Sequence, residues 1–87
     1  MITIDTVGIF LERMGVPAQS FTIGGEADNR WCLLEEDGSW KVFWSERGTR
    51  FDEVTLADEE AACYLLLGRM AQRQLMQGVL QYVPPGA

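Results

Sequence analysis

The first apolar pattern along the chain is helical. Hydrophobic residues recur at steps of three and four, the spacing of one helix face, at Ile4, Val7, Phe10, Leu11 and Met14. This spacing predicts a first helix over residues 5–14. Asp5 is the predicted N-cap, with Thr3 as the alternative. Gly15 and Pro17 mark its end, because glycine adopts the left-handed cap and proline does not continue a helix.

The centre of the chain alternates between apolar and polar positions, as β-strands do. Residues 30–36 and 39–46 flank Asp37-Gly38, a dipeptide that supplies the positive φ angles of a type I′ turn. A two-residue turn fixes the pairing, so Leu33 faces Val42. The face predicted to cover the core carries Trp31, Leu33, Trp40, Val42 and Trp44. We expect Trp31 and Trp44 in the core, whereas Trp40 is either core or a partly exposed anchor for a partner.

Two further strands extend this hairpin. Arg47-Gly48 indicates a second tight turn that returns the chain along residues 49–56. The alternation fails beyond Phe51, which predicts a bulge or a strand end near Asp52. Residues 18–23 favour a short first strand, followed by a polar, glycine-containing loop.

The second helix is the longest predicted element. Asp58 is its predicted N-cap, and its apolar stripe contains Ala62, Cys63, Leu66, Leu67 and Met70. The order of elements predicts an α+β domain: an N-terminal helix, a three- to four-stranded antiparallel meander, and a C-terminal helix packed on one sheet face. We expect one domain over residues 1–83 and a frayed tail over residues 84–87.

Composition limits the chemistry that this domain can perform. The 87 residues include 7 Lys+Arg, 13 Asp+Glu and no histidine, which gives a net charge of -6. An acidic chain is a poor nucleic-acid binder, because phosphate contacts need clustered Lys and Arg. The sequence predicts no metal site and no cofactor, since two cysteines alone do not complete a zinc site. The sequence predicts neither a signal peptide nor a membrane-spanning run, so we expect a cytoplasmic protein with no membrane partner.

No catalytic constellation is visible in the sequence. The carboxylates of residues 35–37 surround a hairpin tip and those of residues 58–60 begin a helix, both solvated positions rather than a desolvated cleft. No base is present to activate Ser45. Cys32 and Cys63 are predicted to be small buried hydrophobes, and the sequence leaves open whether they are paired. We therefore expect a protein that is not an enzyme.

The segment Trp40-Lys41-Val42-Phe43-Trp44-Ser45-Glu46-Arg47-Gly48 resembles a hairpin of small immunity proteins from bacterial polymorphic and contact-dependent toxin systems. The helix start Asp58-Glu59-Glu60-Ala61-Ala62-Cys63 and the helix end Gly15-Val16-Pro17 are also similar to that family. The resemblance spans most of residues 5–70, but only the hairpin and the second helix start are distinctive. It implies a non-enzymatic inhibitor that occludes the active site of a cognate toxin, with NAD-glycohydrolases among the toxin types.

The expected contact surface is an acidic end of the sheet. Most acidic residues lie between residues 26 and 60, and complementary charge speeds the capture of a basic toxin surface. Chemistry and expected exposure select the contact residues Glu35, Glu36, Asp37, Trp40, Glu46, Arg47 and Arg50.

The alternative function is a self-associating regulatory or structural module. A homodimer would form through a sheet edge or through the second helix, where Tyr64, Leu65 and Leu75 widen the apolar stripe.

Overall fold

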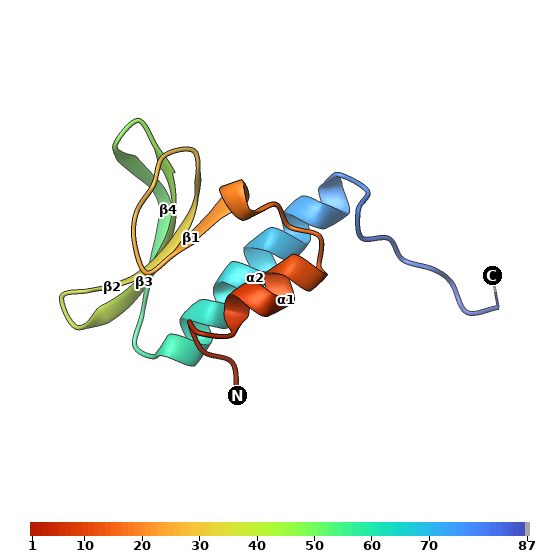
Figure 1. The fold of residues 1–87 in the computed structure, drawn as a ribbon, viewed down its shortest axis with the longest axis horizontal. Helices are drawn as coiled ribbons and strands as arrows, with labels where there is room; N and C mark the ends of the chain where they lie inside the picture. Colours follow the sequence, from red (N-terminus) through yellow and green to blue (C-terminus); the bar gives the residue numbers. More distant parts are fainter. Residues whose placement is uncertain (87) are drawn as a thin grey trace.

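The computed structural model describes residues 1–86, which form an α+β fold of one four-stranded sheet and two helices (Figure 1). In chain order the elements are α1 (Val7–Arg13), a short 3-10 turn η1 (Ala18–Ser20), β1 (Phe21–Ile23), β2 (Arg30–Glu36), β3 (Ser39–Glu46), β4 (Thr49–Leu56) and α2 (Glu59–Met76). The spatial order of the strands is β1-β2-β3-β4. The two helices lie side by side, and α2 packs against the sheet.

The β2–β3 hairpin has the register that its turn predicts. Asp37 and Gly38 both have positive φ, at 54° and 79°, and Leu33 pairs with Val42. Arg47 and Gly48 repeat this geometry between β3 and β4, with φ of 52° and 77°. Both predicted turns are therefore confirmed, and each fixes which side chains share a face.

The predicted irregularity near Asp52 is a β-bulge. Val42 pairs with Val54, but Trp44 pairs with Phe51, so two residues of β4 oppose the single residue between them on β3. Asp52 has a φ of 54°, in the left-handed region. The extra residue changes the phase of β4, which explains why its sequence alternation fails.

The meander prediction was wrong for the first strand. β1 runs parallel to β2, with Phe21 opposite Trp31 and Ile23 opposite Leu33, so the sheet is mixed rather than purely antiparallel. Between Ile23 and Arg30 the chain returns to the end of the sheet at which β1 began, so β2 runs in the same direction as β1. Gly24 begins this return with a φ of 87°, and its N–H donates to the Leu33 carbonyl at 2.7 Å.

The core lies between the helices and the predicted face of the sheet. It contains Leu33 and Val42 from the sheet, Val7 and Leu11 from α1, and Ala62, Cys63, Leu66 and Met70 from α2. Trp31 and Trp40 are half-buried and pack against this cluster, but Trp44 is half-buried outside it. The expectation that Trp44 belongs to the core was therefore wrong.

The helix ends differ in how their backbone groups are satisfied. Asp58 caps α2 as predicted, because its Oδ1 accepts from the Ala61 N–H at 2.7 Å. The first helix starts at Val7 rather than residue 5, and Thr6, not Asp5, precedes it. The carbonyl of Thr3 accepts from the N–H groups of Thr6 and Val7, which winds the chain into a turn before α1 begins.

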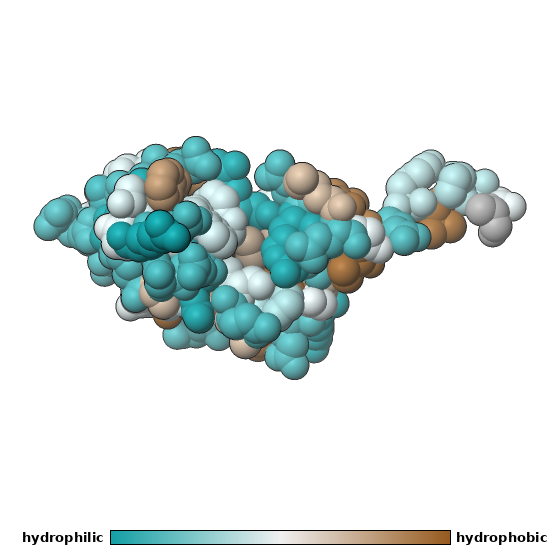
Figure 2. Space-filling view, turned by 90° about the horizontal axis from the view of Figure 1, so that it is seen from above, coloured by the Kyte–Doolittle hydropathy of each residue, from teal (hydrophilic) through white to brown (hydrophobic). Residues whose placement is uncertain are grey.

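The chain leaves the body of the protein after α2 and runs outward (Figure 1). Residues 81–86 are exposed, whereas Ala87, part of the predicted frayed tail, lies outside the described residues. Figure 2 shows hydrophobic side chains gathered where α2 ends and the tail begins, a region that contains the exposed Leu75, Met76 and Val79. None of the helices in residues 1–86 combines the length and apolar character needed to cross a membrane.

A buried amide joins the two helices and provides a test of the fold. The fully buried Gln74 donates from Nε2 to the carbonyl of Met14, at the end of α1, at 2.9 Å. Gln74→Ala leaves that carbonyl without its partner, so we expect a loss of about 1–3 kcal/mol in the free energy of unfolding. Urea denaturation measures this change, with the exposed Gln72→Ala as the matched control. Equal stability of the two variants would contradict a tie between the helices.

Candidate functional site

The sheet register separates the predicted contact residues into groups. The Asp37-Gly38 turn, Glu35 and Trp40 lie at one end of the sheet, which we call the tip end. Glu46 and Arg47 lie at the opposite end, beside the first residue of β2, which we call the loop end. Trp40 and Glu46 are six residues apart on one strand, or about 20 Å at roughly 3.3 Å per residue. The predicted residues therefore do not form one surface.

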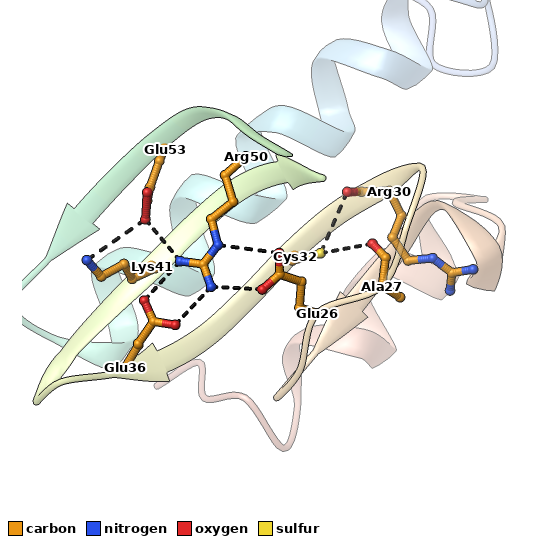
Figure 3. Close-up of polar contacts among 8 residues, drawn as sticks. All are labelled: Glu26, Ala27, Arg30, Cys32, Glu36, Lys41, Arg50 and Glu53. Atoms are coloured by element: carbon orange, nitrogen blue, oxygen red, sulfur yellow. Dashed lines mark hydrogen bonds and ion pairs between the residues drawn. The ribbon is translucent and has the colours of Figure 1, made fainter. Parts of the chain in front are cut away.

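Arg50 and Glu36 bond to each other on the outer face of the sheet, the face turned away from the helices (Figure 3). The two terminal nitrogens of Arg50 lie 2.9 and 2.8 Å from the two Glu36 oxygens, a bidentate pair. Arg50 also bonds Glu26 at 2.8 Å and Glu53 at 3.2 Å. Its guanidinium is thus held by three carboxylates from three parts of the chain.

This group, which we call the Arg50 cluster, also contains Lys41, 3.9 Å from Glu53 (Figure 3). The Arg50 guanidinium stacks 4.2 Å above the ring of Phe43. Phe43 is fully buried and forms a small second core with Cys32 and Leu34. The cluster therefore covers the outer apolar residues, and Arg50 and Glu36 are structural ties instead of free contact groups.

The charges of the cluster perturb one another. The hydrogen bond from Arg50 holds the pKa of the Glu36 carboxyl below its usual value of 4.5. Hydrogen bonds to Glu36 and then to Glu26 raise the pKa of the Arg50 guanidinium. These ion pairs are partly solvated, since the Arg50 side chain is 24% exposed and that of Glu36 is 37% exposed.

The loop over residues 24–29 joins the outer face to the loop end. Glu26 bonds Arg50, and the Ala27 carbonyl lies 3.5 Å from the Cys32 thiol, which donates to it. The Asp28 carboxylate accepts from the backbone N–H of Arg47, and the Asn29 N–H donates to the Ser45 carbonyl at 2.7 Å. The β3–β4 turn is therefore tied to this loop, while the Arg47 side chain itself is exposed.

The tip end carries exposed acidic side chains. Glu35 and Asp37 are exposed beside the half-buried Trp40. Trp40 pairs with Leu56, the last residue of β4, so the start of α2 with Asp58 also lies at this end. The exposed carboxylates here are Glu35, Asp37, Asp58 and Glu60, and none of the ion pairs in residues 1–86 includes them. The tip end is thus an exposed acidic surface beside an aromatic side chain.

The loop end is aromatic. Trp31 and Trp44 meet edge to face with their ring centroids 6.1 Å apart, and the Trp44 Nε1 donates to Glu46 at 3.1 Å. Glu46, predicted as a partner contact, thus orients this indole. A cavity of about 470 Å³ adjoins Trp31 and is lined by Arg69 and Arg73 of α2.

The sequence alone did not predict this cleft at the loop end. The predicted contact residues did not include Arg69 or Arg73 of α2. Their spacing of four places them on one side of α2, at the margin of the stripe that contains Leu66 and Met70. That spacing was the only available signal, and it does not reveal which strand faces the helix.

The two thiols are free and buried, and they belong to separate clusters, Cys63 in the main core and Cys32 in the outer one. Burial raises the pKa of each thiol, which keeps it protonated and poorly nucleophilic. Within residues 1–86, no three His, Cys, Asp or Glu side chains lie together so as to hold a metal ion.

Comparisons with protein-family models, with curated proteins and with solved structures found no match for this chain. The structure itself defines a small α+β domain with an acidic surface at one end and an arginine-lined aromatic cleft at the other.

The Arg50 cluster predicts a pH-dependent stability. A carboxyl with a lowered folded pKa stabilises the fold above its unfolded pKa, and this contribution is lost as the pH falls through the folded value. Glu36→Gln should therefore be less stable than the original protein at pH 7, and the difference should shrink as the pH falls below 4.5. Urea denaturation across this range measures the difference.

The matched control is Glu35→Gln, an adjacent substitution on the other face of the same strand, where the side chain is exposed. We expect little change in stability at pH 7 for this variant. A difference between Glu36→Gln and the original protein that stays constant from pH 7 to pH 3 would contradict the assignment.

Proposed function

We propose that the protein is a non-enzymatic inhibitor of the immunity type, which binds a basic surface of a cognate bacterial toxin domain through its tip end. The supporting observation is the set of exposed carboxylates at that end, none of which forms an ion pair within residues 1–86. Charge of one sign on a protruding hairpin attracts a partner of opposite charge and selects against others.

The tip end also offers an aromatic anchor. Trp40 is half-buried, so its orientation is held by the core while part of the indole remains accessible. Aromatic side chains at the centre of an interface often supply much of the binding energy, and surrounding charge excludes mismatched partners. The proposed contacts are therefore Trp40, Glu35 and Asp37, whereas Glu36 and Arg50 act through the fold.

The mode of inhibition in this proposal is steric. A stable interface buries about 800 Å² on each partner, roughly one seventh of this protein's accessible surface of 5518 Å². A hairpin tip of this kind fits the mouth of an active-site cleft and keeps substrate out. The resemblance of the Trp40–Gly48 hairpin supports an NAD-glycohydrolase type of toxin as the target, with inhibition taking place in the cytoplasm of the producing bacterium.

The test is a binding and activity assay with the C-terminal domain encoded by the gene immediately upstream. We expect the two proteins to co-purify and the toxin activity to be lost in the complex. Glu35→Lys reverses the charge at the tip end and should weaken binding about tenfold, mainly through slower association at low salt. Glu12→Lys, an exposed reversal on α1, is the matched control. Absence of a complex, or equal loss in both variants, would overturn the proposal.

Self-association is the second candidate, favoured by exposed apolar side chains on α2. Tyr64 and Leu75 are 58% and 57% exposed, and their spacing of eleven residues places them on one face of the helix. Gly68 lies between them, and a Cβ there would meet open space, so another helix could approach closely. Leu65, which we expected at this surface, instead packs partly buried against the core.

Sedimentation velocity at micromolar concentration tests this second function. A dimer through α2 should dissociate in Leu75→Glu, because a carboxylate would be buried in the contact. Glu12→Gln, on the other helix, should leave the dimer intact. A monomer at every concentration of the original protein rules out self-association without affecting the toxin-binding proposal.

A further inference from the structure

A cleft at the loop end separates the C-terminal half of α2 from the sheet. Two cavities, of about 470 and 430 Å³, both border Trp31 and Arg73, and we call this pair of cavities the groove. Trp44 and Gln19 line it on one side of the shared residues, and Arg69 and Gln72 line it on the other. The groove therefore has an aromatic and cationic centre and amide side chains on both sides of it.

The arginines of this groove differ from Arg50 in their partners. Among residues 1–86, neither Arg69 nor Arg73 forms an ion pair, whereas Arg50 contacts three carboxylates. The Arg69 guanidinium stacks 5.1 Å above the ring of Trp31, and its buried Nε has no hydrogen-bond partner. A buried donor without an acceptor is costly. An incoming oxyanion beside Arg69 would bond its terminal guanidinium nitrogens and offset part of that cost through its charge.

No carboxylate of residues 1–86 forms an ion pair with Arg69 or Arg73. Glu46 belongs to the same end of the sheet, but its carboxylate accepts from the Trp44 Nε1 at 3.1 Å. Arg73 donates to the side-chain carbonyl of the neighbouring Gln74, a neutral acceptor. In a chain with a net charge of -6, two arginines without ion pairs beside two tryptophans form a locally basic recognition surface.

We propose that this groove binds an acidic peptide segment of a partner protein in an extended conformation. A carboxylate of the segment lies between Arg69 and Arg73, where the guanidinium N–H groups donate to its two oxygens. An adjacent apolar side chain packs against Trp31 and Trp44. The amides of Gln19 and Gln72 bond the peptide backbone, since each amide offers both donors and an acceptor.

The volume of the two cavities favours a peptide over a small anion. A free phosphate would occupy only the cationic centre and leave the amides and Trp44 without contacts. The proposal is independent of the tip end, because the two surfaces lie at opposite ends of the sheet. Loss of one binding activity therefore does not predict loss of the other.

Selection of a phage-displayed random octapeptide library on the intact protein tests the proposal. We expect enriched sequences in which Asp or Glu adjoins an apolar residue. A synthetic enriched peptide should shift the indole NMR signals of Trp31 and Trp44 but leave that of Trp40, at the tip end, unchanged. Enrichment of sequences without acid, or a shift of Trp40 alone, would overturn the assignment.

Variants that change charge distinguish binding in the groove from non-specific electrostatic attraction of the peptide. Arg73→Gln and Gln72→Glu should each weaken the selected peptide about tenfold, since each removes or opposes a charge-assisted bond. Gln72 is exposed, so its variant stays folded even if an arginine variant does not. Arg13→Gln, on α1, is the matched control and should bind as the original protein does. Equal binding by Gln72→Glu would contradict the groove as the site.

Inorganic phosphate provides the remaining comparison. The same titration with sodium phosphate should cause smaller indole shifts and should compete with the peptide only at much higher concentration. Phosphate shifts as large as those of the peptide, at equal concentration, would replace the peptide proposal with a simple oxyanion site.

Discussion

The packing of α2 against the two central strands is the contact on which the rest of the structure depends. Leu66 and Met70 of the helix meet Leu33 and Val42 in one fully buried cluster. The short helix α1 joins the same cluster through Val7 and Leu11, and Gln74 bonds its last carbonyl. A seven-residue helix has little stability by itself. The apolar contacts with α2 and the Gln74 hydrogen bond therefore hold α1 in place.

The outer face of the sheet has no helix to cover it in residues 1–86, and charge replaces apolar packing there. Arg50 spans Phe43 with its planar guanidinium while its nitrogens bind carboxylates from the loop, β2 and β4. The pairs are partly solvated and hence individually weak. Their combined effect comes from the number of hydrogen bonds and their geometry, because one planar guanidinium bonds three segments of the chain at once. The same arrangement keeps the loop over residues 24–29 against Cys32.

The sequence predicted best those features that depend on neighbouring residues. The Asp37-Gly38 turn determined the β2–β3 register, and Asp58 determined the start of α2, because each acts within a few residues of itself. The direction of β1 was not predictable in this way. Three residues are too few to show it, and the parallel pairing depends on loop contacts with Ser45, Arg47 and Arg50.

The same limit applies to the functional surfaces. Sequence identified Arg50 as a charged group on a strand, but its carboxylate partners lie 24, 14 and 3 residues away in the chain. It identified the acid of Glu35 and Asp37 correctly as exposed, since a two-residue turn must face solvent. The groove at the loop end required knowing that Arg69 lies over Trp31, a relation that only the packing of α2 creates.

The bulge at Asp52 has a consequence for how the protein behaves at high concentration. β4 forms one edge of the sheet, and an uninterrupted edge strand is a template for further strands and for fibrils. The left-handed residue breaks the regular spacing of donors and acceptors in the middle of that edge. The exposed carboxylate of Asp52 adds repulsion between copies at the same point. One irregular residue thus makes this exposed edge a poor template for pairing with another copy.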